Sequence, residues 1–114
     1  MSAPTVMSPN LIRGVANVLD GGRRTALRSW EKNRCDIYHC AERAWRAQGM
    51  VVPLTAVIAQ LRRVVPEGRI LPYQDVEGIT RADVAAKFTE AREALLADAD
   101  ALDGPHLMSI GVAQ

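Results

Sequence analysis

Large aromatic side chains are scarce in this chain of 114 residues, in which tryptophan, tyrosine and phenylalanine together make up 4% of the sequence. Small and aliphatic residues must therefore supply most of any hydrophobic core, and such residues favour closely packed helices over strands. Hydrophobic residues at 48% and charged residues at 24% match the composition of a folded globular protein. The length suits one domain, so we expect a single all-α domain.

Long apolar segments and targeting signals are also missing. The longest apolar run, at residues 50–54, contains Pro53, whereas a membrane-spanning helix needs about 18 consecutive apolar residues. The first ten residues, MSAPTVMSPN, lack the basic and then apolar pattern of a secretory signal. We therefore expect no membrane partner and a cytoplasmic location, in a bacterial or infected host cell.

Metal ligands are few, because the chain has two cysteines and two histidines. Cys35 and Cys40 are five residues apart, so on one continuous helix they would point about 140° away from each other, at ~100° per residue. That geometry excludes a disulfide within the helix. His39 lies between them, but His106 is far away in the sequence, and a structural zinc site needs four ligands. We expect reduced, partly buried thiols, no metal and no cofactor.

Motifs of enzyme active sites are absent as well. Residues 20–23, DGGR, lack the spacing and the Lys-Ser/Thr pair of a phosphate-binding P-loop, and no GxGxxG sequence occurs. Cys35 and His39 lie one helical turn apart, but no third group is available to orient them. The sequence therefore predicts a protein that is not an enzyme.

Hydrophobic periodicity predicts a compact bundle of about four helices in a single domain over residues 11–102. The expected helices cover residues 11–19 (with Asn10 as the cap), 23–48, 53–65 and 80–102. They are separated by the Asp-Gly-Gly sequence at 20–22, by Gly49 and by a loop at 66–79 with room for one short strand. A bend is expected near Asn33 in the long second helix. Residues 1–10 and 103–114 are predicted to be extended arms.

The last predicted helix carries the clearest local signals. Thr80 and Asp83 have the spacing of a capping box, and Asp83 and Lys87 that of an ion pair one turn apart. One apolar stripe follows the helix, and it serves either the core or self-association into a dimer or higher oligomer. The residues of this stripe are Val84, Phe88, Ala91, Leu95 and Leu102.

Charge is divided unevenly, although the formal net charge is only +1. Residues 1–66 contain 10 Lys and Arg against 4 Asp and Glu, whereas residues 67–114 contain 4 against 9. Nearly all of the positive set is arginine, whose planar guanidinium binds phosphate through two parallel hydrogen bonds. The basic half either pairs with the acidic half, forms a solvated surface, or binds a polyanion.

Residues 11–30, LIRGVANVLDGGRRTALRSW, contain the strongest motif. A small residue, Ala16, is followed three positions later by Leu19, then by Asp-Gly-Gly and the segment RRTAL. This order resembles the helix-turn-helix of bacterial and phage DNA-binding regulators, in which the turn directs the start of the second helix into the major groove. The match departs in two respects. Asp20 stands where the turn glycine usually falls, with Gly21 one position late, and the second helix continues too far unless it breaks near Asn33.

The resemblance implies a non-enzymatic regulator of transcription, encoded by a phage or mobile element, that binds DNA and commonly dimerises. Arg23, Arg24, Thr25 and Arg28 would then lie at the DNA groove, whereas Arg13, Lys32 and Arg34 would contact phosphates. The alternative is an α-helical assembly or adaptor protein that acts through protein–protein contacts, such as a virion connector component or an inhibitor of a host protein. The uneven charge suits head-to-tail contact of that kind.

Overall fold

The structure is a computed structural model that describes the backbone of residues 8–111 and the side chains of residues 8–101. Within these residues the fold is all-α and has no strand, so the predicted fold class is confirmed and the short strand considered in the 66–79 loop does not form. The elements are α1 (Pro9–Ser29), α2 (Ile37–Ala47), α3 (Leu54–Arg62), the 3₁₀ turn η1 (Pro66–Gly68), α4 (Ile70–Gln74) and α5 (Arg81–Gly111).

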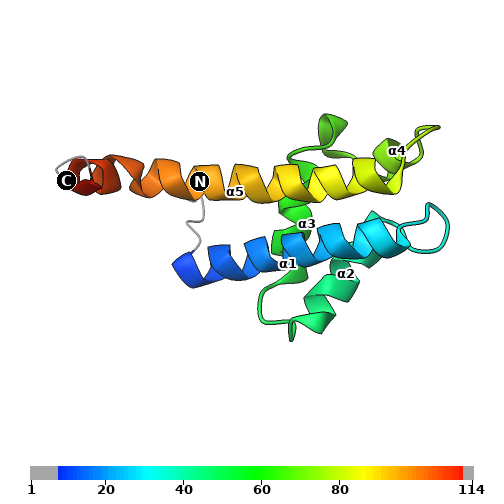
Figure 1. Ribbon diagram of the computed structural model, residues 1–114, viewed down its shortest axis with the longest axis horizontal. Helices are drawn as coiled ribbons and strands as arrows, with labels where there is room; N and C mark the ends of the chain where they lie inside the picture. Colours follow the sequence, from blue (N-terminus) through cyan, green and yellow to red (C-terminus); the bar gives the residue numbers. More distant parts are fainter. Residues whose placement is uncertain (1–7, 112–114) are drawn as a thin grey trace, which may run out of the picture.

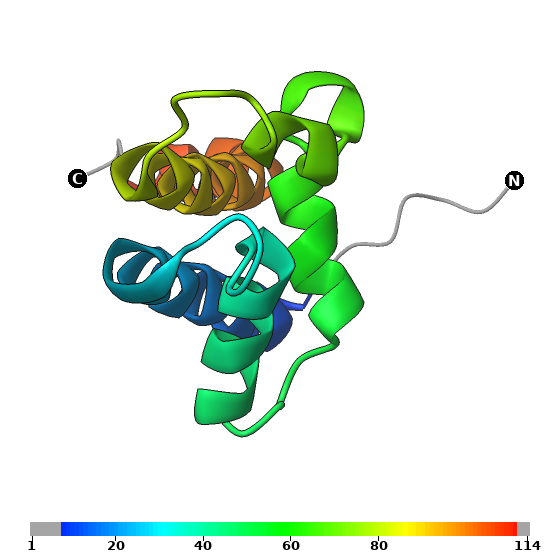
Figure 2. The same cartoon turned by 90° about the vertical axis from the view of Figure 1, so that its right-hand side faces the viewer.

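Helix α1 is the central element of the bundle (Figure 1). Helix α5 lies antiparallel along one side of α1, and α2 packs against another side. Helix α3 crosses both α1 and α5, as the view along their axes shows (Figure 2). The core lies where these four helices meet and consists of aliphatic residues, alanines, two thiols and the rings of Trp30 and Phe88.

Helix α1 runs without interruption through Asp20, Gly21 and Gly22, so the turn predicted at 20–22 is wrong. Both glycines are buried. A Cβ atom on Gly22 would overlap the Phe88 ring of α5, with Cδ1 at 2.6 Å, and a Cβ on Gly21 would lie 3.1 Å from the Ala44 Cβ of α2. The glycines therefore admit two neighbouring helices, and this packing outweighs their cost of about 1 kcal/mol each in a helix interior.

The long helix predicted over residues 23–48 is divided by a tight turn between Trp30 and Asp36, at the bend expected near Asn33. Glu31 and Cys35 exchange two backbone hydrogen bonds of 2.9 Å across this turn. The Asp36 carboxylate then accepts a hydrogen bond of 2.8 Å from the His39 amide and caps the start of α2. Cys35 consequently lies outside the helix that carries Cys40.

The end of α2 follows the prediction. Gly49 has a φ of 84°, a left-handed conformation that glycine adopts without strain. Its amide donates to the carbonyl oxygen of Arg46, and the Met50 amide donates to that of Trp45. These two bonds form the expected glycine C-cap.

The capping box at the start of α5 is also confirmed. The Thr80 hydroxyl accepts from the Asp83 amide at 3.1 Å, and the Asp83 carboxylate accepts from the Thr80 amide at 3.0 Å. The predicted Asp83–Lys87 ion pair is wrong, because Lys87 pairs instead with Glu90 at 3.2 Å and lies over the ring of Tyr73. The loop predicted at 66–79 contains η1 and α4.

The inner part of the apolar stripe of α5 belongs to the core. Val84, Phe88 and Ala91 are 0% exposed and Leu95 is 5% exposed, so these four side chains are not available for self-association. The side chain of Leu102 lies outside the described residues. The burial of the other four side chains of the stripe explains why α5 packs so closely along α1.

Both predicted arms are shorter than expected. The first helix begins at Pro9 with Ser8 as its cap, whereas the prediction placed the cap at Asn10. Residues 1–7 lie outside the described part. Helix α5 continues past Leu102 through Gly104 and Pro105 to Gly111. A proline disfavours helical backbone at the preceding residue partly through a clash with its Cβ, and Gly104 has none. Residues 112–114 of the predicted arm lie outside the description.

The close approach of α5 to α1 at Gly22 can be tested by substitution. We expect Gly22→Ala to lower the free energy of unfolding by about 1–2 kcal/mol, because the overpacking of the new methyl group against the Phe88 ring exceeds the gain of about 1 kcal/mol in helix propensity. Urea denaturation followed by circular dichroism measures this change.

Gly21→Ala is the matched control. Its new methyl group meets the side-chain amide of Gln48 at 2.8 Å and the Ala44 Cβ at 3.1 Å rather than a buried ring. The gain of about 1 kcal/mol in helix propensity offsets this crowding, so we expect stability within about 1 kcal/mol of the wild type. Equal effects of the two substitutions would contradict the special role of Gly22.

Candidate nucleic-acid interface

A groove of about 380 Å³ lies between α1 and α2 on the surface. Its α1 wall consists of residues one helical turn apart, because positions 21, 24, 25 and 28 share one face of a helix. Its α2 wall comes from the last turns of that helix and from the residue that follows it. The lining residues are Gly21, Arg24, Thr25, Arg28, Arg43, Ala44, Ala47 and Gln48.

Small side chains form the floor of the groove and fixed hydrogen bonds hold its walls. The Thr25 hydroxyl donates to the carbonyl oxygen of Gly21 at 2.9 Å and is buried there. The Gln48 side-chain amide donates to the carbonyl oxygen of Asn17 at 2.8 Å, which ties the end of α2 to α1. The hollow therefore results from the small residues that allow the two helices to approach.

Three arginines surround this floor: Arg24 and Arg28 from α1 and Arg43 from α2, all of them exposed. The Arg24 guanidinium lies 3.5 Å from the Asp20 carboxylate, and its side chain is 56% exposed. The Arg43 guanidinium donates to the sulfur of Cys35 at 3.9 Å. No acidic side chain lines the groove. Guanidinium groups placed in this way are suited to phosphate oxygens.

The remaining predicted DNA contacts are placed less favourably. Thr25 lines the groove but is 5% exposed, and its hydroxyl already donates to the Gly21 carbonyl oxygen, so it is poorly placed for a DNA contact. Arg23 lies beside the groove and donates to Asp20 at 3.2 Å. Arg13 lies three turns earlier on α1 and donates to Asn10. Lys32 and Arg34 are exposed in the turn between α1 and α2.

The helix-turn-helix geometry predicted for residues 11–30 is not present, because this segment forms α1 and its C-cap. Arg23 and Arg24 therefore lie in the middle of a helix and not at its N-terminus. They present side chains along the flank of α1, and the backbone amides of that turn are bonded within the helix. Any contact with DNA would be made by the sides of α1 and α2.

Arg43 and Gln48 complete the groove, but sequence reasoning did not include them among the site residues. Their position depends on the break at residues 30–36, which turns α2 back against α1. The available signal was the small residue Ala44, which lies one position after Arg43 and packs on Gly21. Small residues at matching positions of two helices indicate a close crossing and identify which of their neighbours lie beside it.

The basic half of the chain is not neutralised by the acidic half. Of the ion pairs between described side chains, those of the groove helices are local and join residues three or four positions apart. The pair between Arg63 and Asp98, at 2.8 Å, is the one that connects the two halves. The arginines of the groove therefore remain available to a partner.

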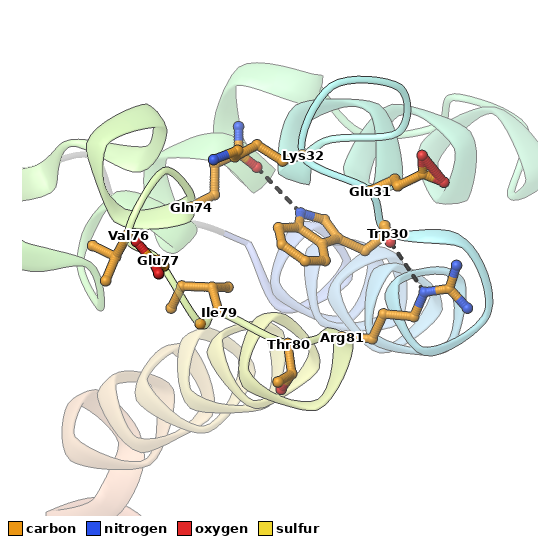
Figure 3. Close-up of a pocket in the computed structure, with 10 residues that line it drawn as sticks. Trp30, Glu31, Lys32, Gln74, Val76, Glu77, Ile79, Thr80 and Arg81 are labelled. Carbon is orange, nitrogen blue, oxygen red and sulfur yellow. Dashed lines mark hydrogen bonds between the residues drawn. The ribbon is translucent and has the colours of Figure 1, made fainter.

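A larger hollow of about 480 Å³ lies between the end of α1 and the segment before α5 (Figure 3). Gln74 is 2% exposed, and its side-chain oxygen accepts hydrogen bonds from the indole of Trp30 at 3.2 Å and from the Ile37 amide at 2.9 Å. Arg81 donates to the carbonyl oxygen of Trp30 at 3.0 Å. These groups join α1, α2, α4 and α5, so the hollow is a structural junction.

The charges of the other hollows are mixed. Glu31, Lys32, Glu77 and Arg81 all line the junction. A third hollow, of about 410 Å³, is lined by Arg62 and Arg69 but also by Asp75. Compared with these two, the groove between α1 and α2 has charge of one sign and is the better candidate for an anion.

The described side chains contain no group of three or more histidine, cysteine, aspartate or glutamate residues close enough to hold a metal ion. No helix in the described part is both long enough and apolar enough to cross a membrane. No family model, curated protein or solved structure matches the chain. The function of the candidate site is therefore inferred from its geometry and charge alone.

The junction at Gln74 gives a direct test of the fold. Gln74→Leu leaves the buried donors of Trp30 and Ile37 without an acceptor, so we expect a loss of about 2 kcal/mol or more in the free energy of unfolding. Urea denaturation measures it. Gln60→Leu is the control, because Gln60 accepts from the half-exposed Arg63, which also pairs with Asp98. If Gln60→Leu loses as much stability as Gln74→Leu, the hydrogen bonds of the junction do not contribute more than those of another buried glutamine.

Proposed function

We propose that this chain is a non-enzymatic DNA-binding protein that holds the phosphate backbone in the groove between α1 and α2. The observation that carries the proposal is the convergence of Arg24, Arg28 and Arg43, from two helices, on one groove without an acidic lining residue. Phosphate contacts supply most of the affinity of non-specific DNA binding. A groove with three exposed guanidinium groups provides contacts of this kind.

The wider charge pattern supports the same partner. The segment that contains α1, the turn and α2, residues 9–48, has eight lysines and arginines and four acidic residues. Its acidic residues are mainly used in local pairs or as the cap of α2. A positive surface of this size raises the local concentration of a polyanion and speeds association.

The geometry favours backbone contact over the reading of bases. Base readout by a helix needs side chains at a helix end or flank that enters the major groove, and the helix end predicted at Arg23 does not exist. The arginines instead surround a hollow that is closed below by Gly21 and Ala44. We therefore expect affinity with little sequence preference, and transcription regulation is not part of the proposal.

The proposal predicts binding that depends strongly on salt. Fluorescence anisotropy of a labelled DNA duplex, titrated with the full chain at several salt concentrations, gives the slope of log affinity against log salt. With three phosphate contacts we expect a slope of about −3, and Arg24→Ala with Arg28→Ala should reduce its magnitude by about 2.

Arg62→Ala is the matched control, because it removes an exposed arginine from outside the groove. We expect the slope to change by less than one unit. Absence of binding at low salt would refute the proposed function, and an equal effect of the control would place the contact elsewhere on the surface.

We propose self-association as a second candidate function, in line with an assembly or adaptor protein. Helix α5 has 31 residues and is about 46 Å long, and its C-terminal end extends beyond the start of α1 (Figure 1). The sequence of that end includes Leu102, Leu107, Met108 and Ile110. A second copy of the chain would cover it.

Sedimentation equilibrium of the full chain tests this second function. We expect a dimer or higher oligomer at micromolar concentration. Leu107→Glu with Ile110→Glu should shift the mass to that of the monomer while leaving the circular dichroism signal of the bundle unchanged. A monomer for the wild type would refute self-association without affecting the DNA proposal.

A further inference from the structure

The sulfur atoms of Cys35 and Cys40 lie 3.7 Å apart. The break between α1 and α2 brings them together: Cys35 lies in the turn, where it is bonded to Glu31, and Cys40 lies in the first turn of α2. The sequence argument against a disulfide assumed that both cysteines were on one helix. That assumption fails, and the sulfurs are already in contact.

The surroundings of the two sulfurs differ. Cys35 is 8% exposed and is contacted by the Arg43 guanidinium, whereas Cys40 is 0% exposed. Burial raises the pKa of the Cys40 thiol well above its usual range, with a further contribution from Cys35. Cys40 is therefore protonated at neutral pH, and Cys35 is the sulfur that a small oxidant reaches first.

We propose that Cys35 and Cys40 are a reversible dithiol–disulfide pair that is oxidised by hydrogen peroxide. The Cys35 sulfur attacks one peroxide oxygen, the O–O bond breaks, and Cys35 becomes a sulfenic acid while one water is released. The Cys40 sulfur then attacks the Cys35 sulfur, and its proton leaves with the hydroxyl group as a second water. Two thiols lose two electrons in total, and the peroxide gains them. A dithiol reductant reverses the reaction.

The local fold can accommodate this bond. A disulfide requires the sulfurs to approach from 3.7 Å to about 2.05 Å, and the residues between Glu31 and Cys35 form a short turn exposed to solvent, which does not confine Cys35 from that side. The closed ring would contain only six residues from Cys35 to Cys40. It would fasten the turn to α2 immediately beside Arg43.

One consequence depends on the proposed function. Arg43 lines the DNA groove and also contacts Cys35, so a new bond at Cys35 changes the environment of a groove arginine. We expect the oxidised protein to bind the labelled duplex with an affinity at least threefold different from that of the reduced protein. The oxidation chemistry itself does not require DNA binding.

Mass spectrometry of the full chain treated with hydrogen peroxide tests the pair. Trypsin cleaves after Arg34 and Arg43, so both cysteines fall in one peptide, CDIYHCAER. We expect this peptide to lose two hydrogen atoms on oxidation and to regain them after treatment with dithiothreitol. Addition of oxygen atoms to the cysteines without the loss of two hydrogens, or no reaction at all, would overturn the proposal.

Two variants test the order of the steps. Cys40→Ala should leave Cys35 as a sulfenic acid that dimedone traps, whereas Cys35→Ala should leave Cys40 unreactive in the folded protein. Circular dichroism checks that both variants fold. Equal trapping in the two variants would refute the assignment of Cys35 as the attacking sulfur. The wild-type peptide decides the disulfide itself, even if a variant does not fold.

The DNA measurement separates the two proposals. If the disulfide forms and neither redox state binds DNA, the redox pair stands and the proposed function fails. If both redox states bind DNA equally, the disulfide stands and its link to the groove through Arg43 is refuted.

Discussion

Two helices approach α1 on adjacent sides at the point where it has no side chains, at Gly21 and Gly22. Phe88 of α5 occupies the space beside Gly22, and Ala44 of α2 lies against Gly21. The order of the layers depends on this contact, because α1 lies between α5 and α2. A chain with few aromatic residues obtains a packed core by bringing helix backbones close together. Its single phenylalanine fills the space beside Gly22, where α1 has no side chain.

The same contact creates the candidate site. Because Gly21 and Ala44 are small, the surface above them is hollow, and the charged side chains around it are all arginines. The formal net charge of +1 therefore describes neither face of the molecule. Within the described side chains the basic and acidic halves are joined by one ion pair, Arg63–Asp98, so the fold keeps the two charges apart. An anion that approaches the α1–α2 face meets arginines whose recorded partners, Asp20 and Cys35, belong to the basic half itself.

Local rules predicted the features that depend on a few neighbouring residues. The capping box of Thr80, the C-cap at Gly49 and the all-α class all follow from spacing and composition, and the structure contains them. The turn predicted at residues 20–22 is wrong for a tertiary reason. Asp-Gly-Gly at 20–22 is a breaker by local propensity, but tertiary packing at Phe88 and Ala44 overrides it.

The candidate site shows the same division between local and tertiary information. Arg24 and Arg28 could be selected from the sequence because they lie close together in a basic segment. Arg43 could not be assigned to them, because its place depends on the turn at 30–36. The contact of Cys35 with Cys40 depends on the same turn, since the two sulfurs meet only if the helix ends before Asp36.

The central claim is that DNA lies against the groove between α1 and α2. Nuclear magnetic resonance of the isotopically labelled chain, titrated with a short DNA duplex, tests it most directly. The account predicts that the amide shifts change most at Gly21, Arg24, Arg28, Arg43 and Gln48, and little along the exposed side of α5. Changes confined to other surfaces, or no changes at low salt, would contradict it.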